Sequence, residues 1–203
     1  MNNISKGRSL SQIQIVTRTS ILGVLAFVLM FLEFPLGFIA PPFIKMDISD
    51  VPALIGAFAM GPVVGITIEL LKNLLHIFLK GTMTAGVGEL SNFIIGSTFV
   101  AVSAIYYQRH KTYKGAVVAL ALGTLAFSFL AIVSNYFVVF PLYGKVMSMD
   151  AIIAMGTAVN GKVTSLWTMM IYSILPFNLL KGAVVSVVTL LVYKKASPFL
   201  HSR

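Results

Sequence analysis

Apolar residues occur in long runs along this chain, and short polar stretches separate the runs. The clearest runs cover residues 18–38, 89–108, 115–140 and 166–193. A helix of about 20 apolar residues matches the ~30 Å hydrocarbon core of a bilayer. The pattern therefore predicts a bundle of membrane-spanning helices at these positions.

The run 51–79 is ambiguous, because Gly61 and Pro62 lie near its middle. As one helix it would be ~43 Å long at ~1.5 Å per residue, which exceeds the thickness of the hydrocarbon core. As two helices, its first half would be unusually short. Proline is accepted in the first turn of a helix but breaks the interior, so both readings stay open on local sequence alone.

Proline and polar residues mark the connections. Pro35, Pro41 and Pro42 are expected to end the first helix, and Ser49 or Asp50 can cap the next one. The stretch 143–165 has a mixed composition and is expected to be a long loop. The chain then divides into a cytoplasmic or interfacial lead (1–17), a six-helix membrane domain (18–195) and a cytoplasmic tail (196–203).

Composition supports the membrane assignment. Of 203 residues, 58% are hydrophobic and 10% are charged, whereas soluble domains are about 25% charged. The chain has no cysteine and three histidines, so it offers little material for a disulfide or a zinc cluster. The first apolar run lacks a small-residue cleavage site and is expected to be a retained helix.

The charges favour the two-helix reading of 51–79. With six crossings and the N-terminus inside, the inner side carries the whole net charge of +9, as the positive-inside rule requires. Its residues are Lys6, Arg8, Arg18, Arg109, Lys111, Lys114, Lys194, Lys195 and Arg203. The expected fold is therefore an all-α integral membrane protein, a six-transmembrane-helix bundle with a short second helix and both termini in the cytoplasm. The basic charge follows from topology and does not indicate nucleic-acid binding.

One stretch nearly matches a nucleotide-binding loop. Residues Gly156 to Val163 fit G-x-x-x-x-G-K-[ST] except at the last position, where the magnesium-binding hydroxyl would be. The predicted topology also places this stretch outside the cell. A glycine-containing connection is the favoured interpretation.

Polar residues at helical spacing form a stripe on the third predicted helix. Glu69, Lys72, Asn73 and His76 share one face. A Glu69–Lys72 pair that neutralises itself is the favoured reading, and a cavity wall or a partner contact is the alternative. Glu33 is a candidate counter-ion for a membrane lysine or a residue of the outer interface.

The last apolar run contains the most informative residues. Lys181 lies near its middle, and Asn178 lies one turn earlier on the same face. A charged group at the bilayer centre costs at least ~2.5–3.5 kcal/mol and commonly marks a binding site. Pro176 interrupts the helix just before Asn178, and broken backbone at membrane depth is tolerated beside a cavity. These residues and Asn135 predict a site for a planar polar heterocycle, with interhelical hydrogen bonding as the alternative.

Two outer loops are expected to close this site. The loop 80–90 is rich in glycine and hydroxyls, and Thr82 and Thr84 are its candidate ligand-binding residues. Phe43 and Met46 in the first loop are candidates for an apolar lid. No metal site is expected. The catalytic patterns G-x-S-x-G and H-E-x-x-H are absent, so an enzyme is not expected.

Several of these stretches together resemble a known family. They are K-x-D-x-S-D-x-P-A-L-I-G from Lys45 to Gly56, the Gly61–Pro62 pair, G-V-G-E-L-S-N from Gly86 to Asn92, and N-x-x-K from Asn178 to Lys181. In them the chain resembles the riboflavin-specific S components (the RibU type) of energy-coupling factor (ECF) vitamin transporters, over about residues 15–195.

The resemblance implies a six-helix, non-enzymatic subunit of the cell membrane that binds riboflavin from the extracytoplasmic side. Its partners would be a transmembrane coupling protein and two cytoplasmic ATPases, with no resident cofactor. In this family Asn and Lys side chains hold the isoalloxazine ring, which points to Asn178, Lys181 and Asn135 here. Small residues on the first helix contact the coupling protein, which points to Thr19, Gly23 and Ala26. A stand-alone vitamin transporter driven by an ion gradient is the alternative function.

Overall fold

The structure, a computed structural model, describes residues 11–82, 86–145 and 147–201. In this part of the chain, five helices are long and apolar enough to cross a membrane. They are α1 (Gln12–Phe31), α3 (Pro62–Lys80), α4 (Val87–Arg109), the continuous helix Tyr113–Tyr143 and the helix Leu166–Tyr193. The chain is thus a helical membrane protein, as its composition predicted.

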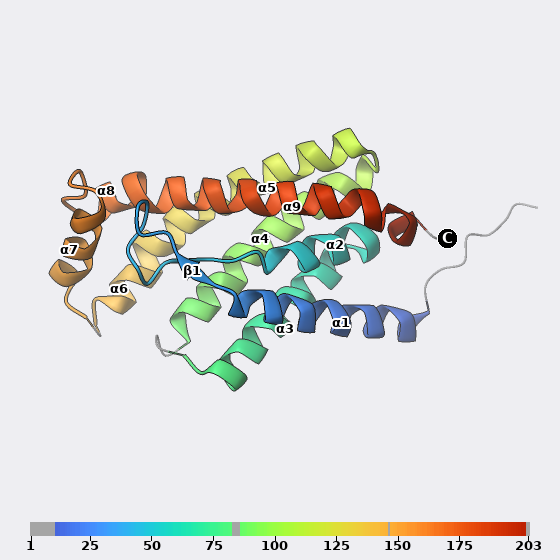
Figure 1. Cartoon of the computed structure of the whole chain (residues 1–203), viewed down its shortest axis with the longest axis horizontal. Helices are drawn as coiled ribbons and strands as arrows, with labels where there is room; N and C mark the ends of the chain where they lie inside the picture. The colour runs from blue at the N-terminus through green and yellow to red at the C-terminus, as the bar shows by residue number, and fades with distance from the viewer. Residues whose placement is uncertain (1–10, 83–85, 146, 202–203) are drawn as a thin grey trace, which may run out of the picture.

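Neighbouring helices pack side by side into an elongated bundle (Figure 1). Contacts run from α1 to α3, from α3 to α4, from α4 to α5 (Tyr113–Ser134), and from α5 to α9 (Leu175–His201). The first turn of α1 and the last turns of α9 lie at one end, together with the turn between α4 and α5. Short elements gather at the opposite end, which we call the loop end.

The short helix α2 (Asp50–Met60) lies inside the bundle, where it contacts α1, α3, α4 and α9. Eight of its eleven residues are buried, as expected for a helix that is apolar on all sides. It ends at Gly61, whose φ of 108° suits glycine, and Pro62 opens α3. The two-helix interpretation of residues 51–79 is therefore confirmed.

The first predicted helix was placed too late. It starts at Gln12 because Ser11 caps it, in a capping box with Gln14. It ends at Phe31, and a small antiparallel pair follows, formed by β1 (Phe34–Pro35) and β2 (Lys45–Met46). Pro35 lies in β1, where it need not donate a ladder hydrogen bond, and Pro41 and Pro42 lie between the two strands.

The predicted long loop at 143–165 contains a helix, α7 (Met149–Val159). Ser148 caps it by accepting a hydrogen bond from the Ala151 backbone N–H. Eleven residues are too few to span a bilayer, so a search for spanning runs missed this helix. It packs between α6 (Phe140–Tyr143) and α8 (Leu166–Met169) at the loop end (Figure 1).

Two π-helical segments widen the long helices near the loop end. They are η1 (Asn135–Val139) and η2 (Met170–Ile174), and each ends two residues before a proline, Pro141 or Pro176. Proline cannot donate to the preceding turn, so the backbone widens there. The interruption predicted at Pro176 is thus a local widening within a continuous helix. Such widenings occur frequently at functional sites.

Close packing of α3 against its neighbours depends on Gly65. A Cβ atom there would lie 2.6 Å from Ala57 Cβ and 2.9 Å from the Ala53 carbonyl oxygen. We expect Gly65→Ala to destabilise the protein by about 1–2 kcal/mol, because overpacking outweighs the better helix propensity of alanine. Gly37→Ala is the control, since nothing lies within 4 Å of its Cβ position. Thermal unfolding in detergent would contradict this expectation if both variants matched the wild type.

Candidate functional site

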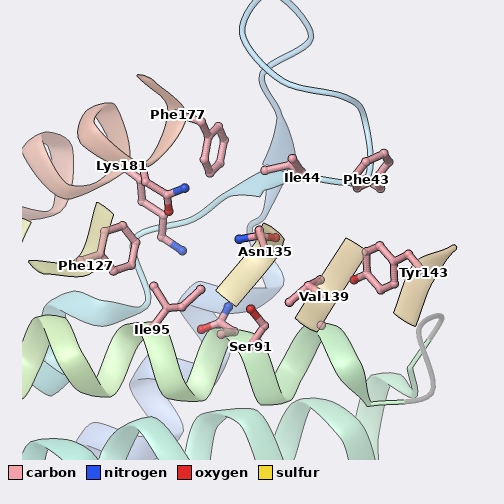
Figure 2. Close-up of a pocket in the computed structure, with 13 residues that line it drawn as sticks. Phe43, Ile44, Ser91, Ile95, Phe127, Asn135, Val139, Tyr143, Phe177 and Lys181 are labelled. Atoms are coloured by element: carbon pink, nitrogen blue, oxygen red, sulfur yellow. The ribbon is translucent and has the colours of Figure 1, made fainter. Parts of the chain in front are cut away.

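A pocket opens at the loop end of the bundle (Figure 2). Its cavity volume is about 170 Å³, which is below the ~300–1,000 Å³ typical of small-molecule sites. The ribbon of α4 forms its floor, α9 and η1 flank it, and the first loop covers it. Its described lining residues are Phe43, Ile44, Gly88, Ser91, Asn92, Ile95, Phe127, Asn135, Val139, Tyr143, Phe177, Asn178 and Lys181.

Two asparagines face the pocket from the two widened helices. The Asn135 amide donates to the Ala131 carbonyl oxygen at 2.7 Å, and the Asn178 amide donates to the Ile174 carbonyl oxygen at 2.7 Å. Each bond joins a side chain to the carbonyl four residues earlier, so it fixes the orientation of the side chain. The amide oxygens and the second N–H groups are then available to a ligand.

Lys181 reaches the pocket from α9 and is 6% exposed. Its Nζ donates to Asp47 Oδ2 at 2.9 Å and lies 3.8 Å from Asp50 Oδ2. The charge that appeared costly in the sequence is therefore compensated by the first loop and by the first residue of α2. An ammonium has three N–H donors, so donors are left for a ligand.

The ion pairs continue into the bundle. Lys72 of α3 contacts Asp50, donates to Ser49 Oγ at 2.9 Å and lies 2.8 Å from Glu69 Oε2. The predicted Glu69–Lys72 pair is confirmed, but Lys72 also forms an ion pair with Asp50. We call Asp47, Asp50, Glu69, Lys72 and Lys181 the buried charge cluster. It joins the first loop to α2, α3 and α9.

Asp47 is the member of this cluster that lies in a loop and not in a helix. Burial opposes ionisation of its carboxyl, but Lys181, Lys72 and hydrogen bonds from Ser49 outweigh that effect. They hold the pKa of Asp47 well below its usual range. Asp47 is therefore a carboxylate at neutral pH and a full counter-charge for Lys181.

Glu33 pairs with Lys45 and Lys80 and not with Lys72 or Lys181. It accepts hydrogen bonds from Lys45 at 2.7 Å and from Lys80 at 2.5 Å. Burial alone would raise the pKa of Glu33, but these two lysines hold it below its ordinary value. This contact ties the first loop to the end of α3.

The structure brings together four of the predicted ligand-binding residues, Phe43, Asn135, Asn178 and Lys181. Met46 is buried beneath the pocket wall, in a cluster with Ala40 and Phe177. Thr82 donates to Glu89 and accepts from the Gly86 N–H, and it is not among the described lining residues. Thr84 lies outside the described residues.

The predicted partner-binding residues lie on the buried face of α1. Thr19, Gly23 and Ala26 are all buried, and Leu71 of α3 lies within 3.2 Å of the Cβ position of Gly23. Small residues here allow α1 and α3 to approach closely. In this arrangement the three residues are covered by the chain itself.

The near-match to a nucleotide-binding loop is a connection between helices and not a phosphate-binding loop. It begins inside α7, continues as a connection and ends at Val163, which is fully buried in the core. A phosphate-binding loop joins a strand to a helix, and this stretch leaves a helix. The described residues also contain no cluster of His, Asp and Glu able to hold a metal ion.

Sequence reasoning missed the acidic half of the site. Asp47 had no predicted role, and Asp50 was predicted only as a candidate helix cap. The available signal was their position beside Ser49, directly before a helix too short to cross the membrane. Asp47 lies just before α2 and Asp50 is its first residue, and both carboxyls are buried in the bundle.

Comparison with known proteins agrees with this architecture. The family model described as "ECF transporter, substrate-specific component" matches residues 14–193. The riboflavin transporter RibU of Staphylococcus aureus is 36% identical over 181 residues, 89% of each chain. The riboflavin transporter FmnP of Bacillus subtilis is 36% identical over 185 residues, 91% of this chain and 92% of the relative.

A solved S component of a bacterial ECF transporter has the same fold. It superposes with a TM-score of 0.75 at 32% identity, and the match covers 94% of this chain and 99% of the other. The resemblance carried by the sequence motifs is confirmed. The chain belongs to the family of substrate-specific components of ECF transporters.

Proposed function

We propose that this chain is the riboflavin-binding S component of an ECF importer, which takes the vitamin from the extracytoplasmic side. The observation that carries the proposal is the pocket, in which three asparagines (Asn92, Asn135 and Asn178) and one ammonium lie among aromatic and aliphatic walls. The pyrimidine edge of riboflavin offers carbonyl acceptors and one N–H donor, and lysine and asparagine match them. Phe43, Phe127 and Phe177 suit the apolar end of the ring (Figure 2).

The placement of charge supports the direction of binding. The turn between α4 and α5, with Arg109, Lys111 and Lys114, lies at the end of the bundle away from the pocket (Figure 1). The positive-inside rule assigns that end to the cytoplasm. The proposed topology then has six crossings, with the short helix α2 as the second, and both termini inside.

A transmembrane coupling protein and two ATPases are the proposed partners. The family is that of the substrate-specific components, and the near-match to a nucleotide-binding loop at 156–163 does not fold as one. Reconstituted uptake is expected to require the partners and ATP. Uptake into vesicles that contain this chain alone and an ion gradient would instead favour a stand-alone transporter.

The first test is the spectrum of the purified protein. Riboflavin is expected to copurify and give the protein a yellow colour with flavin absorption bands. Added riboflavin is expected to lose its fluorescence when it binds to protein from which the vitamin has been removed. If the folded protein shows no flavin absorption and does not quench added riboflavin, the proposal fails. Thiamine, which is cationic, serves as the negative control beside Lys181.

A further inference from the structure

The Asp47 carboxylate is a buried group that the proposed ligand contacts do not use. It lies in the first loop and is 4% exposed. Its Oδ1 accepts from the Ser49 N–H at 2.8 Å and also contacts Ser49 Oγ. Its Oδ2 accepts from Lys181 Nζ at 2.9 Å. Both oxygens are therefore held, one by its own loop and one by the pocket lysine.

We propose that Asp47 is a positioning residue of the binding site: it holds the Lys181 ammonium at the pocket wall, and it acts on the ligand through Lys181. Asp47 does not line the pocket itself, whereas Lys181 does. This inference rests on the proposed function. It extends the site from the groups that touch the vitamin to the carboxylate that orients one of them.

The flexibility of the Lys181 side chain explains why a second group is needed to orient its ammonium. A lysine side chain has four rotatable methylene bonds and takes many conformations unless its end is fixed. The bond to Asp47 fixes that end, and the Oδ2 atom of Asp50 lies 3.8 Å away on a second side. Two carboxylates thus define where the remaining N–H donors point. Fixed donors bind a ligand more tightly than mobile ones, because less freedom is lost on binding.

The surroundings keep Asp47 in place. Its neighbour Asp50 is held by Lys72, and Lys72 also donates to Ser49 at 2.9 Å. The turn from Asp47 to Asp50 is therefore attached to α3 independently of Lys181. The carboxylate has a fixed position from which to orient the lysine.

The ion pair between Asp47 and Lys181 also sets the net charge of the pocket. Among the described lining residues, Lys181 is the one cation, and Asp47 neutralises it. The pocket then presents an N–H donor without net charge. Such a donor suits the carbonyl groups of an uncharged ring, which is the chemistry of the proposed ligand.

A double-mutant cycle on riboflavin affinity tests the proposal. The four proteins are the wild type, Asp47→Asn, Lys181→Met and the double variant. Asparagine keeps the size of Asp47 and removes its charge. We expect Asp47→Asn to weaken binding about tenfold or more in the wild-type background. We expect it to have almost no effect when Lys181 is already methionine, since Asp47 then has no ammonium to orient.

Three outcomes would overturn the proposal: unchanged binding in Asp47→Asn, tighter binding, or an equal loss in both backgrounds. Tighter binding would mean that Asp47 competes with the ligand for Lys181. An equal loss would mean that Asp47 serves only the fold. Asp150→Asn is the matched control, because Asp150 is exposed on α7 and does not line the pocket.

The visible absorption band of bound riboflavin is a second measurement that needs no Lys181 variant. The band responds to hydrogen bonds at the ring, so it is expected to shift in Asp47→Asn and not in Asp150→Asn. An identical band in wild type and Asp47→Asn would contradict the proposal. If the wild type does not bind riboflavin, the proposed function fails; if it binds without the coupling, only this inference fails.

Discussion

Lys72→Met is expected to destabilise the folded protein by about 3–5 kcal/mol, the largest effect that we expect from a single substitution. Lys72 is fully buried and lies between two carboxyls, Asp50 and Glu69 at 2.8 Å. Methionine has a similar size and length, so the change removes the charge with little loss of packing. It leaves Glu69 without Lys72 and leaves Asp50 with only Lys181, at 3.8 Å, so the repulsion and desolvation of these two buried carboxyls are compensated far less.

Thermal or denaturant unfolding in detergent measures this effect. Lys145→Met is the matched control, because Lys145 is exposed at the loop end and makes no described ion pair. A second variant, Lys72→Met with Glu69→Gln, is expected to recover part of the loss by removing one of the stranded carboxyls. A loss below about 1 kcal/mol in Lys72→Met would be typical of a surface pair, and it would show that the buried charge cluster does not stabilise the fold.

The bundle itself could be predicted from the sequence because it depends on the composition of consecutive residues and not on contacts between distant ones. A run of apolar residues crosses a bilayer whatever lies beside it, and the separation of charge between the two ends sets the orientation. The break at Gly61 and Pro62 is also a local signal. Helix α7 escaped prediction because it is apolar but too short to span, so its place depends on packing against α6 and α8.

Only the amides and the lysine of the site could be predicted from the sequence. Asn135, Asn178 and Lys181 were found because a polar group inside a spanning helix is expensive wherever it points. Asp47 was not, since an acidic residue in a loop costs nothing until the loop folds into the bundle. That insertion is a tertiary event, which joins residues 134 positions apart in the sequence. The ion pairs of Glu33 need no such insertion, because its lysine partners lie at the surface.

Lys181→Met is expected to weaken riboflavin binding by about 1.5–3 kcal/mol, or roughly tenfold to 150-fold in Kd. This prediction rests on the proposed function. The ammonium of Lys181 is the strongest hydrogen-bond donor among the described lining residues, and bonds from charged donors exceed neutral ones. Titration of riboflavin fluorescence gives the Kd. Lys162→Met is the control, because Lys162 is an exposed lysine that does not line the pocket.

The same substitution also removes the partner of Asp47, so binding and folding must be separated. A buried carboxylate that loses its partner destabilises the protein, and an unstable protein binds weakly for that reason alone. The double variant Lys181→Met with Asp47→Asn removes both charges and is expected to regain stability while its riboflavin affinity stays low. If affinity returned together with stability, Lys181 would be a structural residue and not a contact to the vitamin. Low affinity in a stable double variant would leave the hydrogen bond from Lys181 to the ring as the cause.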